Sequence, residues 1–247
     1  PNLFVEGIDV ENWRLLNESL DKPLLNRALR GTYPPGSTYK PFMALAALET
    51  GTRSAGTTIQ DNGNWTLGGH TFRSHGSGLG TVDMARSIIK SSNVYYYSLA
   101  NDMGVDAMHD FMAPLGFGQI TGIDLRGEVR GVLPSQAWKR ETYKRPEQKR
   151  WYAGETISLG IGQGYNTFTM LQLASATATL ANDGVKYTPR VVGSMRESHG
   201  GDTKDTTQIK GVDLGFAQSH VDLIKEAMVG VTVEGTSRFV FADAPYS

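Results

Sequence analysis

The order of apolar and polar positions along the chain predicts a structure made mainly of helices. The clearest helix is expected from Ser37 to about Thr50, because residues 42–48 are apolar on almost every side and Gly51 follows as a stop signal. A helix without a polar face is buried in the middle of a protein. Just before it, residues 31–36 (Gly-Thr-Tyr-Pro-Pro-Gly) predict a rigid turn.

Other segments carry weaker versions of the same signals. Apolar periodicity, polar first residues and glycine stops predict further helices over residues 23–30, 81–90, 94–103, 105–114, 169–182 and 219–229. Residues 1–22 and 52–80 are expected to be irregular, apart from one short strand in the latter, and residues 185–192 are expected to form a strand. Residues 139–150 hold six basic and two acidic side chains and predict an exposed loop. The result is a mainly helical chain whose one or two strands have no obvious partner.

Composition removes several classes of function. The 247 residues include no cysteine, which excludes a disulfide framework, cysteine-ligated metals and a cysteine nucleophile. The net charge is −1, so binding of nucleic acid through bulk positive charge is not expected. The longest apolar stretch, at 42–48, is far shorter than the roughly 20 residues that cross a bilayer. The sequence opens at Pro1 and stops at Ser247 as if both ends were cut.

One short motif offers nucleophilic chemistry. Ser-x-x-Lys occurs three times, at positions 19/22, 37/40 and 87/90. Such a pair acts as nucleophile and base when the serine begins a helix and the lysine is desolvated, because burial lowers the lysine pKa. Ser37 and Lys40 fit this requirement, since a proline-rich turn precedes them and the apolar run follows. The plain alternative is that Ser37 is only a helix cap.

A second polar motif follows at Ser91-Ser92-Asn93, between two predicted helices and 51 residues after Lys40. A hydroxyl and a carboxamide there could both point into one cleft. The alternative is an ordinary turn at a helix end, where Ser and Asn are common.

Together with three further segments, these motifs resemble a known family. In chain order the matching segments are Leu24-Leu-Asn-Arg-Ala28, residues 33–41 (Tyr-Pro-Pro-Gly-Ser-Thr-Tyr-Lys-Pro), residues 91–93, Thr121-Gly-Ile-Asp124 and Gly160-Ile-Gly-Gln-Gly164. They resemble the transpeptidase domain of class B penicillin-binding proteins, most closely the elongation-specific type called penicillin-binding protein 2. The resemblance implies an α+β fold of the serine β-lactamase and D,D-peptidase type, with an antiparallel sheet flanked by helices. Residues 1–247 would be mainly its helical part, truncated at both ends, without the membrane anchor and pedestal domain.

The resemblance also implies roles for particular residues. Ser37 would be the acylated nucleophile, Lys40 its base, Ser91 a proton relay and Asn93 a catalytic residue that also holds the substrate amide. Gly162 and Gln163 would bind substrate. The reaction would be cross-linking of peptidoglycan stem peptides through a serine acyl-enzyme, with no cofactor. The family's Lys-Thr/Ser-Gly motif does not occur in these 247 residues, so this chain by itself is expected to be inactive or impaired.

The implied partners follow from that reaction. They are peptidoglycan stem peptides, β-lactam antibiotics and, for the full-length protein, a membrane glycosyltransferase and elongation scaffold proteins, but no nucleic acid. The implied location is the periplasmic face of the bacterial inner membrane.

Three other interpretations stay open from the sequence. The first is a serine β-lactamase or a β-lactam sensor domain, which would use the same serine. The second is a non-catalytic scaffold module that binds partners through Lys139–Arg150. The third is a metal site formed by Asp61, His70 and His75, although their spacing does not fit metal ligands well and no metal is expected.

Overall fold

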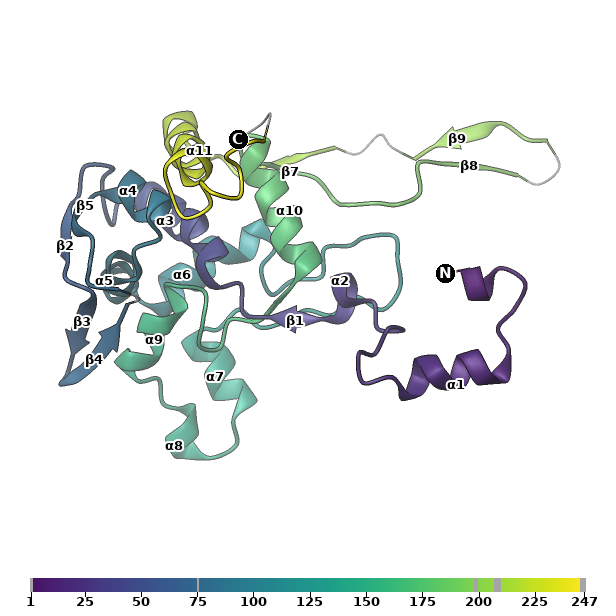
Figure 1. Ribbon diagram of the computed structural model, residues 1–247, viewed down its shortest axis with the longest axis horizontal. Coiled ribbons are helices and arrows are strands. Elements are labelled where there is room, and N and C mark those ends of the chain that lie inside the picture. The colour runs from purple at the N-terminus through teal and green to yellow at the C-terminus, as the bar shows by residue number, and fades with distance from the viewer. Residues whose placement is uncertain (1, 75, 198–199, 207–209, 245–247) are drawn as a thin grey trace.

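The helix predicted around the apolar run forms the centre of the structure. The computed structural model describes residues 2–74, 76–197, 200–206 and 210–244. In it, α3 (Lys40–Glu49) is buried from its first residue to Leu48. Four helices pack on α3, namely α4 (Met84–Ile89), α5 (Asn93–Met103), α6 (Val105–Leu115) and α11 (Gln218–Val233). This enclosure explains why α3 needs apolar side chains all round (Figure 1).

An aromatic cluster joins the start of α3 to distant segments. Tyr39 ends the 3₁₀ turn η2 (Gly36–Tyr39), and its ring lies 5.3 Å from that of Phe117 and 5.9 Å from that of Phe168. Phe42 lies against the same Phe117 ring at 5.1 Å. All four rings are buried. The turn that carries Ser37 therefore stands on a packed aromatic base.

The strands correct the expectation of unpartnered strands. In the described part of the chain they form five antiparallel ladders of two strands each. The ladders are β1 (Thr32–Tyr33) with β6 (Phe168–Thr169), β2 (Ile59–Asp61) with β5 (Gly80–Val82), β3 (Asn64–Leu67) with β4 (His70–Arg73), β7 (Val185–Lys186) with β10 (Val212–Asp213), and β8 (Ser194–Arg196) with β9 (Thr203–Asp205). The partners in β1–β6, β2–β5 and β7–β10 are far apart in sequence, so local pattern did not reveal them, whereas β3–β4 and β8–β9 join neighbouring segments.

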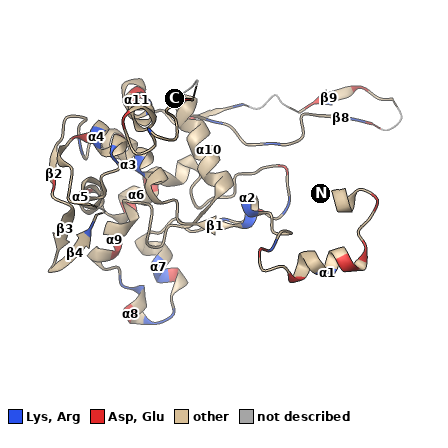
Figure 2. Cartoon of the chain, viewed as in Figure 1, with Lys and Arg blue, Asp and Glu red and all other residues tan. Residues whose placement is uncertain are grey.

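The remaining helices of the described residues include several that the sequence pattern did not predict. The remaining helices are η1 (Asn2–Phe4), α1 (Val10–Glu18), α2 (Arg27–Arg30), α7 (Gln136–Thr142), α8 (Pro146–Lys149), α9 (Ala153–Leu159) and α10 (Met170–Ala181). The segment 1–22 was expected to be irregular but holds α1. The segment 139–150 was expected to be an exposed loop but is largely α7 and α8, on which both signs of charge are interspersed (Figure 2). Lys139 within it is buried and pairs with Glu155.

Several predicted helix ends shift by one or a few residues. Asp83 caps α4 by accepting the Arg86 N–H at 2.8 Å, whereas the expected first residue, Thr81, lies in β5. α11 begins at Gln218, one residue before the predicted start, and Ala217 precedes it without a side-chain cap. The expected strand over 185–192 is only the two residues of β7.

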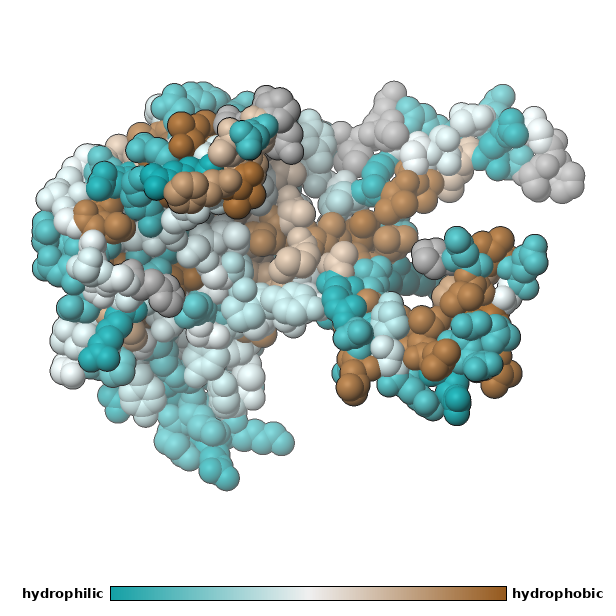
Figure 3. Space-filling view, viewed as in Figure 1, coloured by the Kyte–Doolittle hydropathy of each residue, from teal (hydrophilic) through white to brown (hydrophobic). Residues whose placement is uncertain are grey.

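Two arms leave the helical body on the same side (Figure 1). One is the N-terminal segment with α1, and the other is the β8–β9 hairpin. Both carry exposed apolar side chains (Figure 3), among them Trp13, Leu20 and Met195. The hairpin is tied to the body by Asp124, whose carboxylate accepts the N–H groups of Val191 and Val192 at 2.8 and 2.9 Å. Within the described ranges, no helix has both the length and the apolar character needed to cross a bilayer.

Candidate active site

Ser37 lies on a turn whose position is set by the backbone. It belongs to η2, directly before α3, and its side chain is exposed. Gly36 has a φ of +57°, which glycine adopts without strain, and its N–H donates to the Gly162 carbonyl at 3.0 Å. The residue expected to open an α-helix thus sits in a tighter 3₁₀ turn that presents its hydroxyl at the helix start.

Lys40 is the first residue of α3 and is 1% exposed. Its Nζ donates to Ser91 O at 2.8 Å, Ser91 Oγ at 2.9 Å and Asn93 Oδ1 at 2.7 Å. Burial lowers the pKa of Lys40 from 10.5 to about 7, while the negative charge of Asp61 acts in the opposite direction. Lys40 is therefore available as a neutral amine near neutral pH.

The turn at Ser91–Asn93 connects α4 to α5. Ser91 has a φ of +55°, a left-handed conformation that costs a residue with a side chain about 1 kcal/mol or more. The turn is held by Ser92, whose N–H donates to Ser87 O at 2.9 Å and whose hydroxyl accepts the Tyr95 N–H at 3.1 Å. In this conformation Ser91 Oγ donates to Ser37 Oγ at 3.1 Å.

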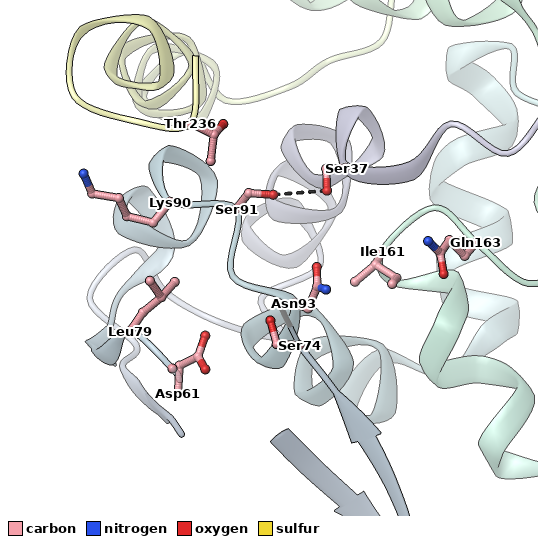
Figure 4. A pocket seen from close by; sticks show the side chains of 11 residues that line it. Ser37, Asp61, Ser74, Leu79, Lys90, Ser91, Asn93, Ile161, Gln163 and Thr236 are labelled. Atoms are coloured by element: carbon pink, nitrogen blue, oxygen red, sulfur yellow. Dashed lines mark hydrogen bonds between the residues drawn. The ribbon is translucent and has the colours of Figure 1, made fainter. Parts of the chain in front are cut away.

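Ser37, Ser91 and Asn93 line one cleft of about 340 Å³. Figure 4 shows the hydroxyls of Ser37 and Ser91 pointing toward one another across it. The residues lining the cleft are Ser37, Asp61, Ser74, Gly78, Leu79, Lys90, Ser91, Asn93, Ile161, Gln163 and Thr236. The arrangement is a hydroxyl linked through a second hydroxyl to a buried amine, which suits acyl transfer by a serine nucleophile.

Comparison with known families matches residues 2–247 to the family described as penicillin binding protein transpeptidase domain. The chain belongs to this family. Its α+β fold, expected from the motifs, is confirmed by the solved structures that it resembles.

This transpeptidase domain is similar to several characterised proteins. It is 43% identical to the peptidoglycan D,D-transpeptidase MrdA of Acinetobacter baumannii over 243 residues, covering 96% of this chain and 35% of that protein. It resembles the crystal structure of Pseudomonas aeruginosa PBP2 in complex with WCK 5153 with a TM-score of 0.88 and 38% identity, covering 100% of this chain and 55% of that one. It also resembles the complex of PBP2 and MreC from Helicobacter pylori with a TM-score of 0.78 and 29% identity, covering 94% of this chain and 41% of that one. The domain thus spans about a third of the length of the curated relative.

The other two Ser-x-x-Lys pairs lie elsewhere in the transpeptidase domain. Ser87 is buried within α4 and its hydroxyl donates to Met84 O at 2.7 Å. Lys90 lines the cleft, but its Nζ donates to Glu234 O at 2.6 Å. The pair at 19/22 lies at the end of α1, in the N-terminal arm. Burial distinguishes Lys40 from these lysines, because Lys40 is buried whereas Lys22 is exposed and Lys90 is half-buried.

Gly162 and Gln163, predicted to bind substrate, occupy different environments. Gly162 is buried with a φ of +69°, and a Cβ there would lie 2.3 Å from Gly36 O and 2.8 Å from Tyr39 Cβ. It packs against the turn that carries Ser37. Gln163 is exposed and lines the cleft (Figure 4). Substrate binding by either residue stays a prediction.

The hypothetical metal site does not form among the residues that the structure describes, where no three His, Asp or Glu side chains gather around one point. The Asp61 carboxylate accepts the Ser92 hydroxyl at 2.6 Å and the Gly63 N–H at 2.8 Å. His70 lies edge-on to Phe72 with 4.7 Å between ring centroids. His75 lies outside the described residues. The sequence suggested Asp61 as a metal ligand and gave no sign of its contact with Ser92, which is 31 residues away.

Proposed function

We propose that this domain is the catalytic part of a peptidoglycan D,D-transpeptidase that works through a serine acyl-enzyme on Ser37. The single observation that carries the proposal is the chain of hydrogen bonds from Ser37 Oγ through Ser91 Oγ to Lys40 Nζ, at 3.1 and 2.9 Å. The name of the Acinetobacter baumannii relative supports the same reaction. The fold alone would not decide the activity, because one fold hosts several functions.

The proton path follows from what each partner of Lys40 can do. A protonated lysine has three donors, and its three acceptors are Ser91 O, Ser91 Oγ and Asn93 Oδ1. A neutral lysine has two donors and a lone pair. The two carbonyl oxygens can only accept hydrogen bonds. The lone pair of neutral Lys40 therefore accepts its hydrogen bond from the Ser91 hydroxyl, which can donate as well as accept. Neutral Lys40 therefore takes the Ser37 proton through Ser91.

Both half-reactions balance with these groups. Ser37 Oγ attacks the carbonyl carbon of the D-Ala–D-Ala bond, its proton passes through Ser91 to Lys40, and the C–N bond breaks as Lys40 returns that proton to the leaving D-Ala. An amine of a second stem peptide then attacks the ester, and the proton it loses restores the Ser37 hydroxyl. Asn93 keeps its carboxamide NH₂ for the substrate while its oxygen accepts from Lys40.

The location and partners follow from the substrate and from the relatives. Because peptidoglycan lies outside the inner membrane, we assign the protein to the periplasmic face of that membrane. The complex of PBP2 with MreC from Helicobacter pylori supports a scaffold partner of the MreC kind for the protein that contains this domain. Co-purification of the natural full-length protein with its MreC tests this assignment, and a failure to co-purify would contradict it.

Intact-protein mass spectrometry tests the proposed reaction directly. The natural full-length protein is incubated with benzylpenicillin, with and without the substitution Ser37→Ala. We expect a stable covalent adduct on the wild-type protein, located to Ser37 by peptide mapping, and none on the variant. An adduct that persists in the variant, or no adduct on either protein, would refute the assignment.

The same sample discriminates the β-lactamase alternative. A transpeptidase holds the penicilloyl ester for long periods, whereas a β-lactamase hydrolyses it quickly. Sustained turnover of a chromogenic β-lactam would therefore favour a β-lactamase. We expect a single burst equal to the amount of protein.

A further inference from the structure

The structure contains a buried acid next to the proposed site for which the reaction as written has no use. Asp61 ends β2 and is 2% exposed. It lines the same cleft as Ser37 and Ser91. Burial of a carboxylate costs free energy unless hydrogen bonds compensate it. The hydrogen-bond partners of Asp61 therefore indicate its role.

Those partners connect Asp61 to the turn that holds the relay serine. One oxygen accepts the Gly63 N–H at 2.8 Å, which fixes the carboxylate at the end of its own strand. The other accepts the hydroxyl of Ser92 at 2.6 Å. Ser92 is 1% exposed and lies between Ser91 and Asn93, the two residues whose side chains bond to Lys40.

The hydroxyl of Ser92 has a second task that requires a fixed orientation. It accepts the Tyr95 N–H at 3.1 Å and so caps α5. Because the hydroxyl proton of Ser92 points at Asp61, the lone pairs of the Ser92 oxygen face the start of α5. The carboxylate thereby selects the rotamer in which Ser92 caps the helix, and the cap fixes the turn in which Ser91 has its positive φ.

We propose that Asp61 is a positioning residue of the acylation site, which holds the Ser91–Asn93 turn against Lys40 through the Ser92 hydroxyl. This inference rests on the proposed function, because it concerns the rate at which Ser37 is acylated. Asp61 does not touch Ser37 or the substrate carbonyl in this scheme. It acts through Ser92 and through its charge.

The charge of Asp61 gives the proposal a second consequence. Burial lowers the Lys40 pKa and the Asp61 charge partly restores it. Other groups near this site are the Tyr96 ring on α5, 5.6 Å from Lys40 Nζ, and Lys90 at the end of α4, whose Nζ lies 3.8 Å from the Glu234 carboxylate beyond α11. These groups stay in place when Asp61 is changed. Removing its charge therefore moves the lysine titration to lower pH.

The test is the pH profile of benzylpenicillin acylation of Ser37 in the full-length protein. For the wild type the rate should rise with pH to a plateau, with a midpoint near 7, because neutral Lys40 is the base. For Asp61→Asn we expect the plateau to fall about 10-fold, since a loosened turn misplaces the relay, and the midpoint to move to lower pH.

Two variants of Ser92 distinguish the positioning of the turn from the effect of the Asp61 charge. Ser92→Ala removes the hydrogen bond but keeps the Asp61 carboxylate, so we expect a comparable fall of the plateau with the midpoint still near the wild-type value. Ser92→Thr restores a hydroxyl and should recover most of the lost rate. The matched control is Asp83→Asn, which likewise removes one carboxylate charge, that of the residue capping α4, and should leave the midpoint unchanged.

Each outcome decides the proposal. A plateau in Asp61→Asn within twofold of the wild type overturns the positioning role, and an equal midpoint shift in Ser92→Ala and Asp61→Asn overturns the charge effect. If Asp61→Asn does not fold, the Ser92 pair still decides, because full activity of Ser92→Ala overturns the proposal. If the wild type forms no Ser37 adduct, the proposed function itself fails, which is a distinct result.

Discussion

The buried amine of Lys40 should make the stability of the fold depend on pH in a specific way. Its pKa is about 7 in the folded protein, lowered from 10.5 by burial. Between these two values the unfolded chain binds a proton at this side chain and the folded protein does not. Stability therefore rises with pH across this window and falls as pH drops toward 7. At about 1.36 kcal/mol per pKa unit, the whole window corresponds to about 5 kcal/mol in the free energy of unfolding.

The assay compares the wild type with Lys40→Met in urea unfolding at several pH values from 7 to 10. Methionine is long and unbranched but does not titrate, so all other titrating groups cancel in the difference between the two proteins. We expect that difference to rise by about 1.4 kcal/mol per pH unit in the middle of the window. The slope decides the test, because the variant also leaves acceptors at Ser91 and Asn93 without their donor. A difference that stays constant within about 0.5 kcal/mol would refute the lowered pKa.

Three further predictions concern single contacts. In chemical unfolding, Gly162→Ala should lose about 2 kcal/mol more stability than Gly51→Ala. Both glycines have a φ of +69°, but only at Gly162 would an added Cβ lie 2.3 Å from a backbone oxygen. Equal losses of stability in the two variants would contradict this close approach. Ser91→Ala should slow benzylpenicillin acylation on the order of 100-fold, because it removes the relay hydroxyl, and a loss below threefold in stopped-flow acylation would exclude the relay. Glu155→Gln should destabilise the domain by about 3 kcal/mol, because it leaves the buried Lys139 ammonium without its carboxylate. The double variant Lys139→Met with Glu155→Leu should recover most of the melting temperature that Glu155→Gln loses.

The parts of the site that were predictable from sequence are those with local signals. The apolar run placed α3 in the core, and the proline-rich turn before it singled out Ser37 and Lys40 among three equivalent spacings. Both signals lie within one helical segment, so they are visible without knowledge of the fold. The motif at residues 91–93 was found for the same reason, since a polar break between two helices is a local feature.

What escaped prediction depends on partners far along the chain. Nothing near Lys139 shows that it pairs with Glu155 in a surround of aromatic rings, and its basic neighbours suggested an exposed loop. The contact between Asp61 and Ser92 crosses 31 residues, and that between Gly36 and Gly162 crosses a still longer stretch. Tertiary packing decided these positions against the local pattern.

The bond between Gly36 and the carbonyl of Gly162 has a consequence for synthesis of the protein. A ribosome makes the nucleophile turn early, but the segment that supports it is made only after the chain from α3 through α9. Translation adds about 5–20 residues per second, so several seconds separate the synthesis of the two segments. A nascent chain that stops before residue 162 should carry Ser37 without a formed site. Acylation of Ser37 should therefore begin only in chains that extend beyond residue 162.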